Sequence, residues 1–369
     1  MSRFVKNCTL QTTTKFQIRN IFRNLLGRYS PVHGMIFPKY ERRTSVSLYS
    51  LFHPHVFQGR KRKTSYFEGW YFKMAKEGRV LAIIPGVAFG ESEMDRHAFI
   101  QVFTNMDGKS RYVTYPFDSF HADDKELDIT IGKNRFSRSF IDLDIESDTI
   151  TLKGRIDHDE IHPFPVTLAA PGIMGWYAYV PFMECFHGVV STYHGLKGVL
   201  RLDDRPFDFT DGNGYIEKDW GTSFPRAWIW MQSNGFPSKD ISCMLSVAEI
   251  PFLGRVFTGF LGFVQVGNRL IRFGTYTGAK ITTLEVSDRE AKVVIEDGHH
   301  IIKFTAETGT SAHLAAPRQG KMERKILESL EGRIALHIFD KRNNSVILED
   351  VGLSAGVELS EADRLSTER

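Results

Sequence analysis

Carboxylates stand among aromatic side chains at two places in this sequence, a combination that suits proton transfer in an apolar pocket. The run YFEGWYFK at residues 66–73 surrounds Glu68 with five aromatic residues. In a strand, alternate side chains share a face, so Tyr66, Glu68 and Trp70 would point one way and residues 67, 69, 71 and 73 the other. Desolvation by the rings disfavours the charged form of an acid. Glu68 is therefore our first candidate for a general acid near neutral pH.

The second place is the segment 214–234, which holds three of the five tryptophans. Its acids Glu217 and Asp219 are the other candidate proton donors, and Arg226 could hold either acid ionised or orient a ligand oxygen. Tryptophans two residues apart share one face of a strand. The candidate walls of an apolar pocket are the aromatic residues of both runs: Tyr66, Trp70, Trp220, Trp228 and Trp230.

A third run, GWYAYVPFMECFHG at residues 175–188, adds the candidate ligand contacts Trp176, Glu184 and His187. His187 could accept a proton near neutral pH, and Gln101, in the strand-like run 97–104, could hydrogen-bond a ligand. The sequence leaves a structural interpretation open for each candidate. The acids could be buried and paired with a base, the histidine could be a satisfied core residue, and the tryptophans could fill a core between two halves.

The three runs, in this order and spacing, resemble the tocopherol cyclase family, and the resemblance spans residues 52–359. It implies a prenylated hydroquinone as the hydrophobic substrate and ring closure to a chromanol as the reaction. An acid would protonate the alkene of the first isoprene unit, and the phenolic oxygen would then attack the tertiary carbon. The resemblance implies no cofactor and no metal. It also implies two lipocalin-like β-barrel or sandwich halves packed together, an arrangement similar to that of hydroxyneurosporene hydratases.

Strand-like runs separated by turn signals recur along the chain, which predicts an all-β, antiparallel fold with few short helices. The segments 321–331 and 360–366 are the best helix candidates after residue 30. We expect a basic N-terminal extension at 1–50, a first β half at 51–200, a second at 201–359 and a C-terminal tail at 360–369.

Composition excludes several classes of function. The net charge of +3 is too small to indicate nucleic-acid binding, and the three cysteines form no metal-binding or disulfide pattern. The pair His299-His300 lacks a third ligand at metal-site spacing. Walker A, GxGxxG and GxSxG motifs are absent from the sequence.

The N-terminal region is the most basic part of the chain. Residues 1–40 contain seven lysines and arginines and no acid, and no run of 18 apolar residues occurs in the chain. This composition fits an organellar transit peptide, and residues 15–26 could form a basic amphipathic helix on a membrane surface. An extension packed on the body is the alternative. We therefore expect a cytoplasmic or peripheral membrane protein, with organellar targeting as a further option.

Two other functions fit the same residues. A lipocalin-like carrier would hold a hydrophobic ligand without transforming it, and a related hydratase or pericyclase would act on a different apolar substrate. A carrier needs only the pocket, whereas a cyclase also needs an acid within reach of an alkene.

Overall fold

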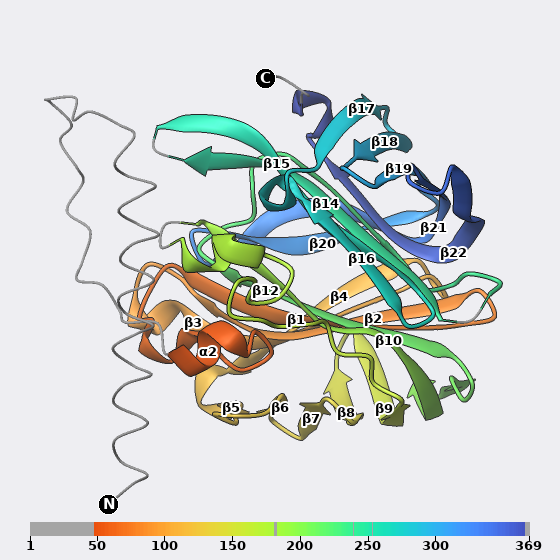
Figure 1. The fold of residues 1–369 in the computed structure, drawn as a ribbon. Coiled ribbons are helices and arrows are strands. Elements are labelled where there is room, and N and C mark those ends of the chain that lie inside the picture. The colour runs from red at the N-terminus through yellow and green to blue at the C-terminus, as the bar shows by residue number, and fades with distance from the viewer. Residues whose placement is uncertain (1–47, 181–182, 239, 253, 366–369) are drawn as a thin grey trace, which may run out of the picture. The chain divides into compact units, whose positions relative to one another are not determined.

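Most of the chain forms antiparallel strands in two sheets (Figure 1). The computed structural model describes residues 48–180, 183–238, 240–252 and 254–365. The predicted extension 1–50, except its last three residues, and the predicted amphipathic helix 15–26 lie outside the described residues. None of the described helices is long and apolar enough to cross a membrane.

The first sheet has twelve strands. They are β1 (Tyr66–Lys76), β2 (Arg79–Phe89), β3 (Arg96–Thr104), β4 (Lys109–Pro116), β5 (Phe120–Ala122), β6 (Asp128–Ile131), β7 (Asn134–Ser137), β8 (Phe140–Ser147), β9 (Ile150–Asp159), β10 (Cys185–Leu202), β11 (Arg205–Asp208) and β12 (Asn213–Gly221).

The second sheet has ten strands. They are β13 (Trp228–Ser233), β14 (Ile241–Phe252), β15 (Arg255–Val266), β16 (Arg269–Gly274), β17 (Lys280–Val286), β18 (Glu290–Glu296), β19 (His300–Glu307), β20 (Ser311–Arg318), β21 (Lys321–Asp340) and β22 (Ser345–Ser360).

The described helices are short. They are α2 (Leu48–Phe52), η1 (Gly59–Lys61), η2 (Glu93–Asp95), η3 (Phe117–Ser119), η4 (Gly175–Tyr179), η5 (Thr275–Thr277) and η6 (Ala362–Arg364).

Both sheets follow the same strand order. The first runs β4-β3-β2-β1-β12-β10-β9-β8-β7-β6-β5, and the second runs β16-β15-β14-β13-β22-β21-β19-β18-β17. In each, four strands form a meander, and the last strand of the half pairs beside the first strand of the same half. This repeated order confirms the predicted all-β fold of two antiparallel halves.

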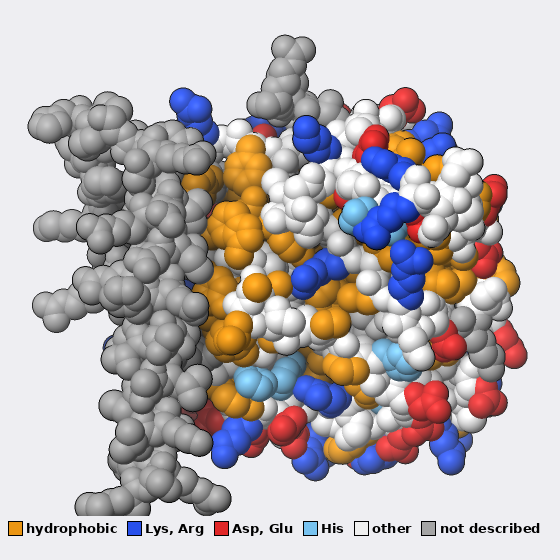
Figure 2. Space-filling view, viewed as in Figure 1, with side chains coloured by type: hydrophobic (Ala, Val, Ile, Leu, Met, Phe, Trp, Pro, Cys, Tyr) orange, Lys and Arg blue, Asp and Glu red, His pale blue; other side chains and the backbone are white. Residues whose placement is uncertain are grey.

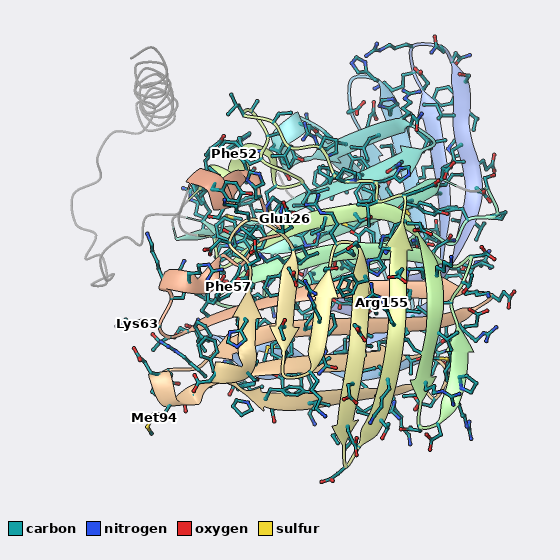
Figure 3. The ribbon with its side chains drawn as sticks, turned by 90° about the horizontal axis from the view of Figure 1, so that it is seen from below. Phe52, Phe57, Lys63, Met94, Glu126 and Arg155 are labelled. Carbon is teal, nitrogen blue, oxygen red and sulfur yellow. The ribbon has the colours of Figure 1, made fainter. Side chains whose placement is uncertain are left out.

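Three clusters of buried apolar side chains form the core of the protein. Seen from below in Figure 3, strands β5–β9 lie in front of β1–β4, with Phe57 near β5 and Arg155 on β9. The first core fills the space between these layers, and the second sheet encloses a core of its own. A third core joins the two sheets, with Tyr71 and Tyr215 from the first meeting Trp228 and Trp230 from the second. A pocket at this junction would draw its walls from both halves.

Strand β1 has the alternation that its sequence predicts. Tyr66 and Trp70 belong to the first core, whereas Tyr71 belongs to the core between the sheets. All three side chains are buried, because both faces of β1 are covered. The candidate acid Glu68 therefore faces the interior of the first half, away from the junction.

One helix prediction was wrong. The segment 321–331 is the first part of the long strand β21, and the only regular structure in 360–366 is the end of β22 and the short η6 among the described residues. In β21, Leu327 is 53% exposed and Glu328 is 1% exposed, the inverse of the usual pattern. The sequence KILESLE follows a helical pattern. Its strand alternation is visible only once Glu328 is known to line a cavity.

The change of sheet falls in the connection between Gly221 and Trp228, because β12 completes the first sheet. Strand β10 crosses residue 200 without interruption. The division into domains at 51–200 and 201–359 stays a prediction.

A buried ion pair fastens the chain before β1 to the first sheet. The Lys218 ammonium lies 2.5 Å from the Glu68 carboxylate, and both side chains are fully buried. Lys218 also donates to the backbone oxygens of Pro54 and Val56, while the backbone N–H groups of residues 58 and 59 donate to Glu68. Burial lowers the pKa of Lys218 to about 8, although Glu68 opposes this shift. Both members of the pair therefore have hydrogen-bond partners in addition to each other, which is typical of a structural ion pair.

Replacing Lys218 with methionine should leave Glu68 as an unpaired buried carboxylate. We expect the variant Lys218→Met to lose about 3–5 kcal/mol of unfolding free energy, measured by urea denaturation, because breaking a buried pair leaves one charge uncompensated. The control Lys153→Met removes a half-exposed lysine that pairs with Asp144 and Glu146, and it should cost less than about 1 kcal/mol. Equal losses in the two variants would contradict a structural role for the buried pair.

Candidate active site between the two sheets

The larger cavity of the site lies at the junction of the sheets. It has a volume of about 280 Å³, and its lining is mostly apolar: residues from η4, β13, β14 and β15, with Phe224, surround His187 and Asp219. Trp176 and Phe252 belong to this lining and are 38% and 42% exposed, so the cavity reaches the surface there. Figure 2 shows hydrophobic side chains gathered on the face that carries η4 and the β14–β15 hairpin.

A smaller cavity of about 90 Å³ adjoins the larger one, because Asp219, Phe224 and Trp230 line both. Gln101 contributes to its wall, and four carboxylates also line it: Glu217, Asp219, Glu328 and Glu358. The first two acids come from β12 and the other two from β21 and β22. The junction therefore combines an apolar chamber with an acidic inner end.

His187 is held between two of these acids. Its Nδ1 lies 2.8 Å from Asp219 Oδ1, and its Nε2 lies 3.4 Å from Glu217 Oε2. Glu217 also accepts a 2.7 Å hydrogen bond from the Tyr215 hydroxyl. The alternation of β12 and the pairing of His187 with Asp219 across β10 and β12 bring these groups together.

These contacts determine the charge of His187. Burial lowers its pKa, but the attraction of Asp219 and Glu217 outweighs burial and raises the pKa to about 10. His187 is therefore an imidazolium at neutral pH and has no free lone pair. The sequence-based hypothesis that it accepts a proton does not fit this geometry, and Asp219 is the better candidate for the base.

Glu328 and Glu358 are neighbours across β21 and β22. The Tyr71 hydroxyl donates to Glu328 at 2.7 Å, and the Trp228 indole N–H donates to Glu358 at 2.6 Å. Burial raises the pKa of Glu328 to about 7, against the opposing effects of the Tyr71 hydrogen bond and the Lys73 charge. Burial and the neighbouring Glu328 raise the pKa of Glu358 well above its ordinary value. This pair is therefore the most readily protonated acid group that the described site contains.

A buried lysine lies near the same end of the site. Lys73, from β1, donates a 2.7 Å hydrogen bond to the Gln232 side chain, from β13. Burial lowers its pKa to about 7, although Glu328 opposes the shift. Among the described residues, His187 is the only cation that forms an ion pair with any of the four acids. The site therefore has fewer positive charges than carboxyl groups.

Trp230 carries a buried donor that no protein group satisfies. Its side chain is 7% exposed and lines both cavities, and its Nε1 has no acceptor among the described residues. Its ring meets the Tyr71 ring edge to face, with 5.5 Å between centroids. Gly356 leaves room for the indole, since a Cβ there would lie 2.7 Å from the ring. A buried N–H without a partner is rare, so this one indicates a ligand acceptor.

The structure brings some of the sequence candidates together and separates others. Those that line a cavity are Gln101, Trp176, His187, Glu217, Asp219, Trp228 and Trp230. Those that line neither cavity are Tyr66, Glu68, Trp70, Glu184, Trp220 and Arg226.

The residues outside the cavities have structural contacts instead. The Tyr66 hydroxyl donates to Glu68, Trp70 donates to the backbone of His55, and Trp220 stacks on Phe186. The Glu184 side chain is exposed, as the loop before β10 leaves it at the surface. Arg226 is 66% exposed and lies 3.9 Å from Glu361, so it holds neither Glu217 nor Asp219.

The sequence patterns did not indicate four residues of the site: Tyr71, Lys73, Glu328 and Glu358. Tyr71 and Lys73 belong to the YFEGWYFK run, and the predicted alternation already places them together on the face opposite Glu68. The signal was present, but the aromatic neighbours of Glu68 favoured the other face. Glu328 was hidden by the helix assignment, and Glu358 stands beyond any aromatic run.

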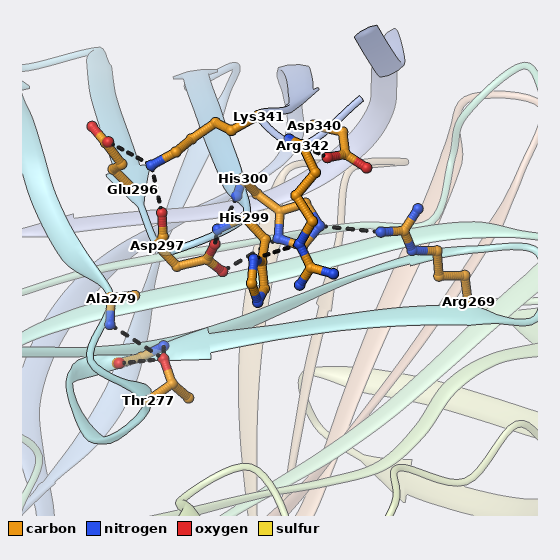
Figure 4. Close-up of polar contacts among 11 residues, drawn as sticks. Arg269, Thr277, Ala279, Glu296, Asp297, His299, His300, Asp340, Lys341 and Arg342 are labelled. Atoms are coloured by element: carbon orange, nitrogen blue, oxygen red, sulfur yellow. Dashed lines mark hydrogen bonds and ion pairs between the residues drawn. The ribbon is translucent and has the colours of Figure 1, made fainter. Parts of the chain in front are cut away.

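A metal ion would find suitable donor atoms only at one place in the described part of the chain, where atoms of His187, Glu217 and Asp219 lie within 4.8 Å of one another. Those three groups already pair with each other. The His299-His300 pair has internal partners too (Figure 4): His300 lies 3.1 Å from Arg269 and 3.3 Å from Asp297, and His299 accepts from Arg342 at 2.6 Å.

Comparisons with known proteins agree on one family. The family described as tocopherol cyclase-like matches residues 163–360, more than half of the chain. The probable tocopherol cyclase, chloroplastic, of Oryza sativa subsp. japonica is 35% identical over 212 residues, which are 53% of this chain and 43% of the rice protein. The tocopherol cyclase, chloroplastic, of Zea mays is 39% identical over 75 residues, 20% of this chain and 16% of the maize protein. In both cases the match spans less than half of the relative.

Solved structures give more distant matches. A putative AttH protein from Nitrosomonas europaea matches with 12% identity and a TM-score of 0.48, over 80% of this chain and 92% of that one. CghA bound to Sch210972 matches with 10% identity and a TM-score of 0.47, over 82% and 89%. Kievitone hydratase from Nectria haematococca matches with 12% identity and a TM-score of 0.43, over 83% and 93%.

The charge of His187 predicts a pH-dependent contribution to stability. Because its pKa is about 10 in the folded protein and about 6.5 in the unfolded chain, its stabilisation is complete below pH 6.5 and is lost as the pH rises through 10. We expect His187→Gln to be less stable than the wild type by about 3 kcal/mol at pH 6. Urea unfolding at pH 6, 8 and 10 should show that the difference in unfolding free energy between the two proteins decreases as the pH rises.

The exposed substitution Arg226→Gln provides the control, and its stability should follow that of the wild type at every pH. A gap between His187→Gln and the wild type that stays constant from pH 6 to 10 would contradict the imidazolium assignment.

Proposed function

Because the chain belongs to the tocopherol cyclase-like family, we propose that it closes a chromanol ring on a prenylated hydroquinone by proton transfer alone. The observation that carries this proposal is the apolar cavity whose inner end holds carboxyl groups among tryptophans. Such a site can keep an acid protonated, exclude water and stabilise a short-lived cation.

The reaction is an isomerisation, so it needs no outside reactant. A carboxylic acid gives its proton to the less substituted carbon of the first alkene of the tail, which leaves a positive charge on the tertiary carbon. The phenolic oxygen forms a bond to that carbon and loses its proton to a base. One C–O bond replaces one C=C π bond, and the proton gained by the carbon equals the proton lost by the phenol.

Asp219 is the base that this proposal assigns. It lines both cavities, and its contact with His187 Nδ1 orients the carboxylate. A base at the boundary of the two cavities would lie beside the phenol of a substrate whose ring occupies the inner end.

The tryptophans have a role of their own. Trp228 and Trp230 project from the same face of β13 into the larger cavity. The negative face of an aromatic ring stabilises a nearby cation, and the carboxylates of Glu217 and Asp219 add electrostatic stabilisation. The rest of the prenyl tail would leave along the apolar opening at Trp176 and Phe252.

Substrate delivery is a further part of the proposal. A prenylated quinol resides in membranes, and the basic residues of 1–50 would attract anionic lipid or direct the protein to an organelle. The two curated relatives carry the word chloroplastic in their names. Fusing residues 1–47 to a fluorescent protein and observing its location tests this role.

The purified protein should convert a prenylated benzoquinol, kept reduced under anaerobic conditions, into a chromanol of unchanged mass with a shifted chromatographic retention. Asp219→Asn should lower the turnover by about 100-fold or more, because general base catalysis supplies about that factor. The matched control Glu184→Gln removes an exposed acid outside both cavities and should keep wild-type turnover.

A wild-type protein that binds the quinol and returns it unchanged would contradict the cyclase and support a carrier. In a carrier, Asp219→Asn would bind the ligand as tightly as the wild type does. Addition of water to the alkene, detected as a mass increase, would instead support a hydratase.

A further inference from the structure

The ring closure needs a proton donor, and the sequence offers Glu68, Glu217 and Asp219. The structure argues against each as the donor. Glu68 lies outside both cavities in a satisfied ion pair with Lys218. Glu217 and Asp219 are both engaged by His187, at 3.4 Å and 2.8 Å, and Asp219 is already assigned as the base.

Glu328 and Glu358 are differently placed. They stand opposite each other on β21 and β22, and both line the smaller cavity. Each receives one hydrogen bond from an aromatic residue of another strand, Tyr71 on β1 and Trp228 on β13. Two carboxyl groups this close together, away from water, share a proton more readily than they ionise together.

The charged groups around the pair strengthen this tendency. From β12, the charge of Glu217 raises the pKa of both Glu328 and Glu358, and the charge of Asp219 raises the pKa of Glu358. From β1, Lys73 favours the ionised form of Glu328, but burial lowers the pKa of that lysine to about 7. On β21, the charge of Arg324 attracts Glu358, and its guanidinium lies over the Trp228 ring, 4.6 Å from the centroid. Burial and the two acids of β12 raise the pKa of the pair, against the effect of these cations.

A second observation indicates where the substrate's oxygen lies. The Trp230 indole N–H is buried and unpartnered, and the Trp230 side chain lines both cavities. Trp230 stands opposite Glu358 in the pairing of β13 with β22. An acceptor bound at this N–H would therefore lie next to the acid pair and to Asp219.

We propose that the Glu328–Glu358 pair is the proton donor of the ring closure, and that Trp230 Nε1 binds the phenolic oxygen that attacks. This assignment rests on the proposed cyclase function. It identifies the substrate as a phenol whose oxygen and first alkene are a few bonds apart, because the donor and the N–H belong to neighbouring strands.

The proton balance closes within the site. The pair gives one proton to the alkene carbon and becomes more negative by one charge. The phenolic oxygen bonds to the tertiary carbon, and its proton passes to Asp219. One transfer from Asp219 to the pair across the smaller cavity restores both groups, so that the protein returns to its starting state with the chromanol bound.

The test compares isosteric variants in the full-length protein. Glu358→Gln and Glu328→Gln should each lower the turnover of a prenylated benzoquinol by about 100-fold or more. The affinity for the chromanol product, measured by quenching of tryptophan fluorescence, should change by less than about threefold. The matched controls Glu349→Gln on β22 and Glu323→Gln on β21 remove exposed acids and should keep wild-type turnover.

Two further readouts separate a proton donor from a structural residue. Wild-type turnover should fall as the pH rises above about 7, where Glu328 ionises, whereas the residual turnover of Glu328→Gln should lose this dependence. Glu358→Asp should recover part of the activity. Trp230→Phe should weaken chromanol binding by about fivefold, the effect of one hydrogen bond.

Thermal denaturation shows whether each variant is folded, and glutamine in place of a desolvated acid should not lower the stability. Turnover within fivefold of wild type in both glutamine variants would overturn the assignment while leaving the cyclase function intact. A wild-type protein that forms no chromanol would overturn the proposed function, and the assignment with it.

Discussion

Desolvation of carboxyl groups at the junction of the two sheets is the constraint on which the rest of the site depends. Moving an ionised carboxylate from water into a protein interior costs several kcal/mol unless a partner compensates it. At this junction His187 compensates Glu217 and Asp219, while Glu328 and Glu358 receive only neutral donors. The acids of one half are thus paired with a cation, whereas burial raises the pKa of the acids of the other half. A base and an acid are the result, and both arise from the same chemical group.

The repeated strand order explains how the two halves come to share one site. Strand β12 of the first half and β22 of the second occupy the same place in their sheets, and each carries an inward glutamate opposite an aromatic residue of the neighbouring strand. Glu217 stands opposite Tyr71, and Glu358 stands opposite Trp230. The Tyr71 and Trp230 rings then meet at the junction. Packing two similar halves face to face therefore concentrates carboxyl groups that either half alone would expose to water.

The sequence patterns predicted the fold better than the geometry of the site. Periodicity and turn signals were sufficient for an all-β fold, and the alternation in YFEGWYFK correctly separated Glu68 from Tyr71. What alternation cannot decide is which face of a doubly buried strand meets the cavity. Glu68 lies outside the site because Lys218, 150 positions later in the chain, supplies its buried ion-pair partner. Glu328 could not be found without the pairing of β21 with β22, because its neighbours follow a helical pattern.

The alternation of side chains in strand β12 limits which sequence changes the strand can accept. Along Glu217, Lys218, Asp219 and Trp220, successive side chains serve the site and the first core in turn. Deleting or inserting a single residue within this strand would exchange the two faces, so that the lysine would enter the site and the acids would enter the core. Variation in length is therefore confined to the loops, and the strand can be altered only by substitution.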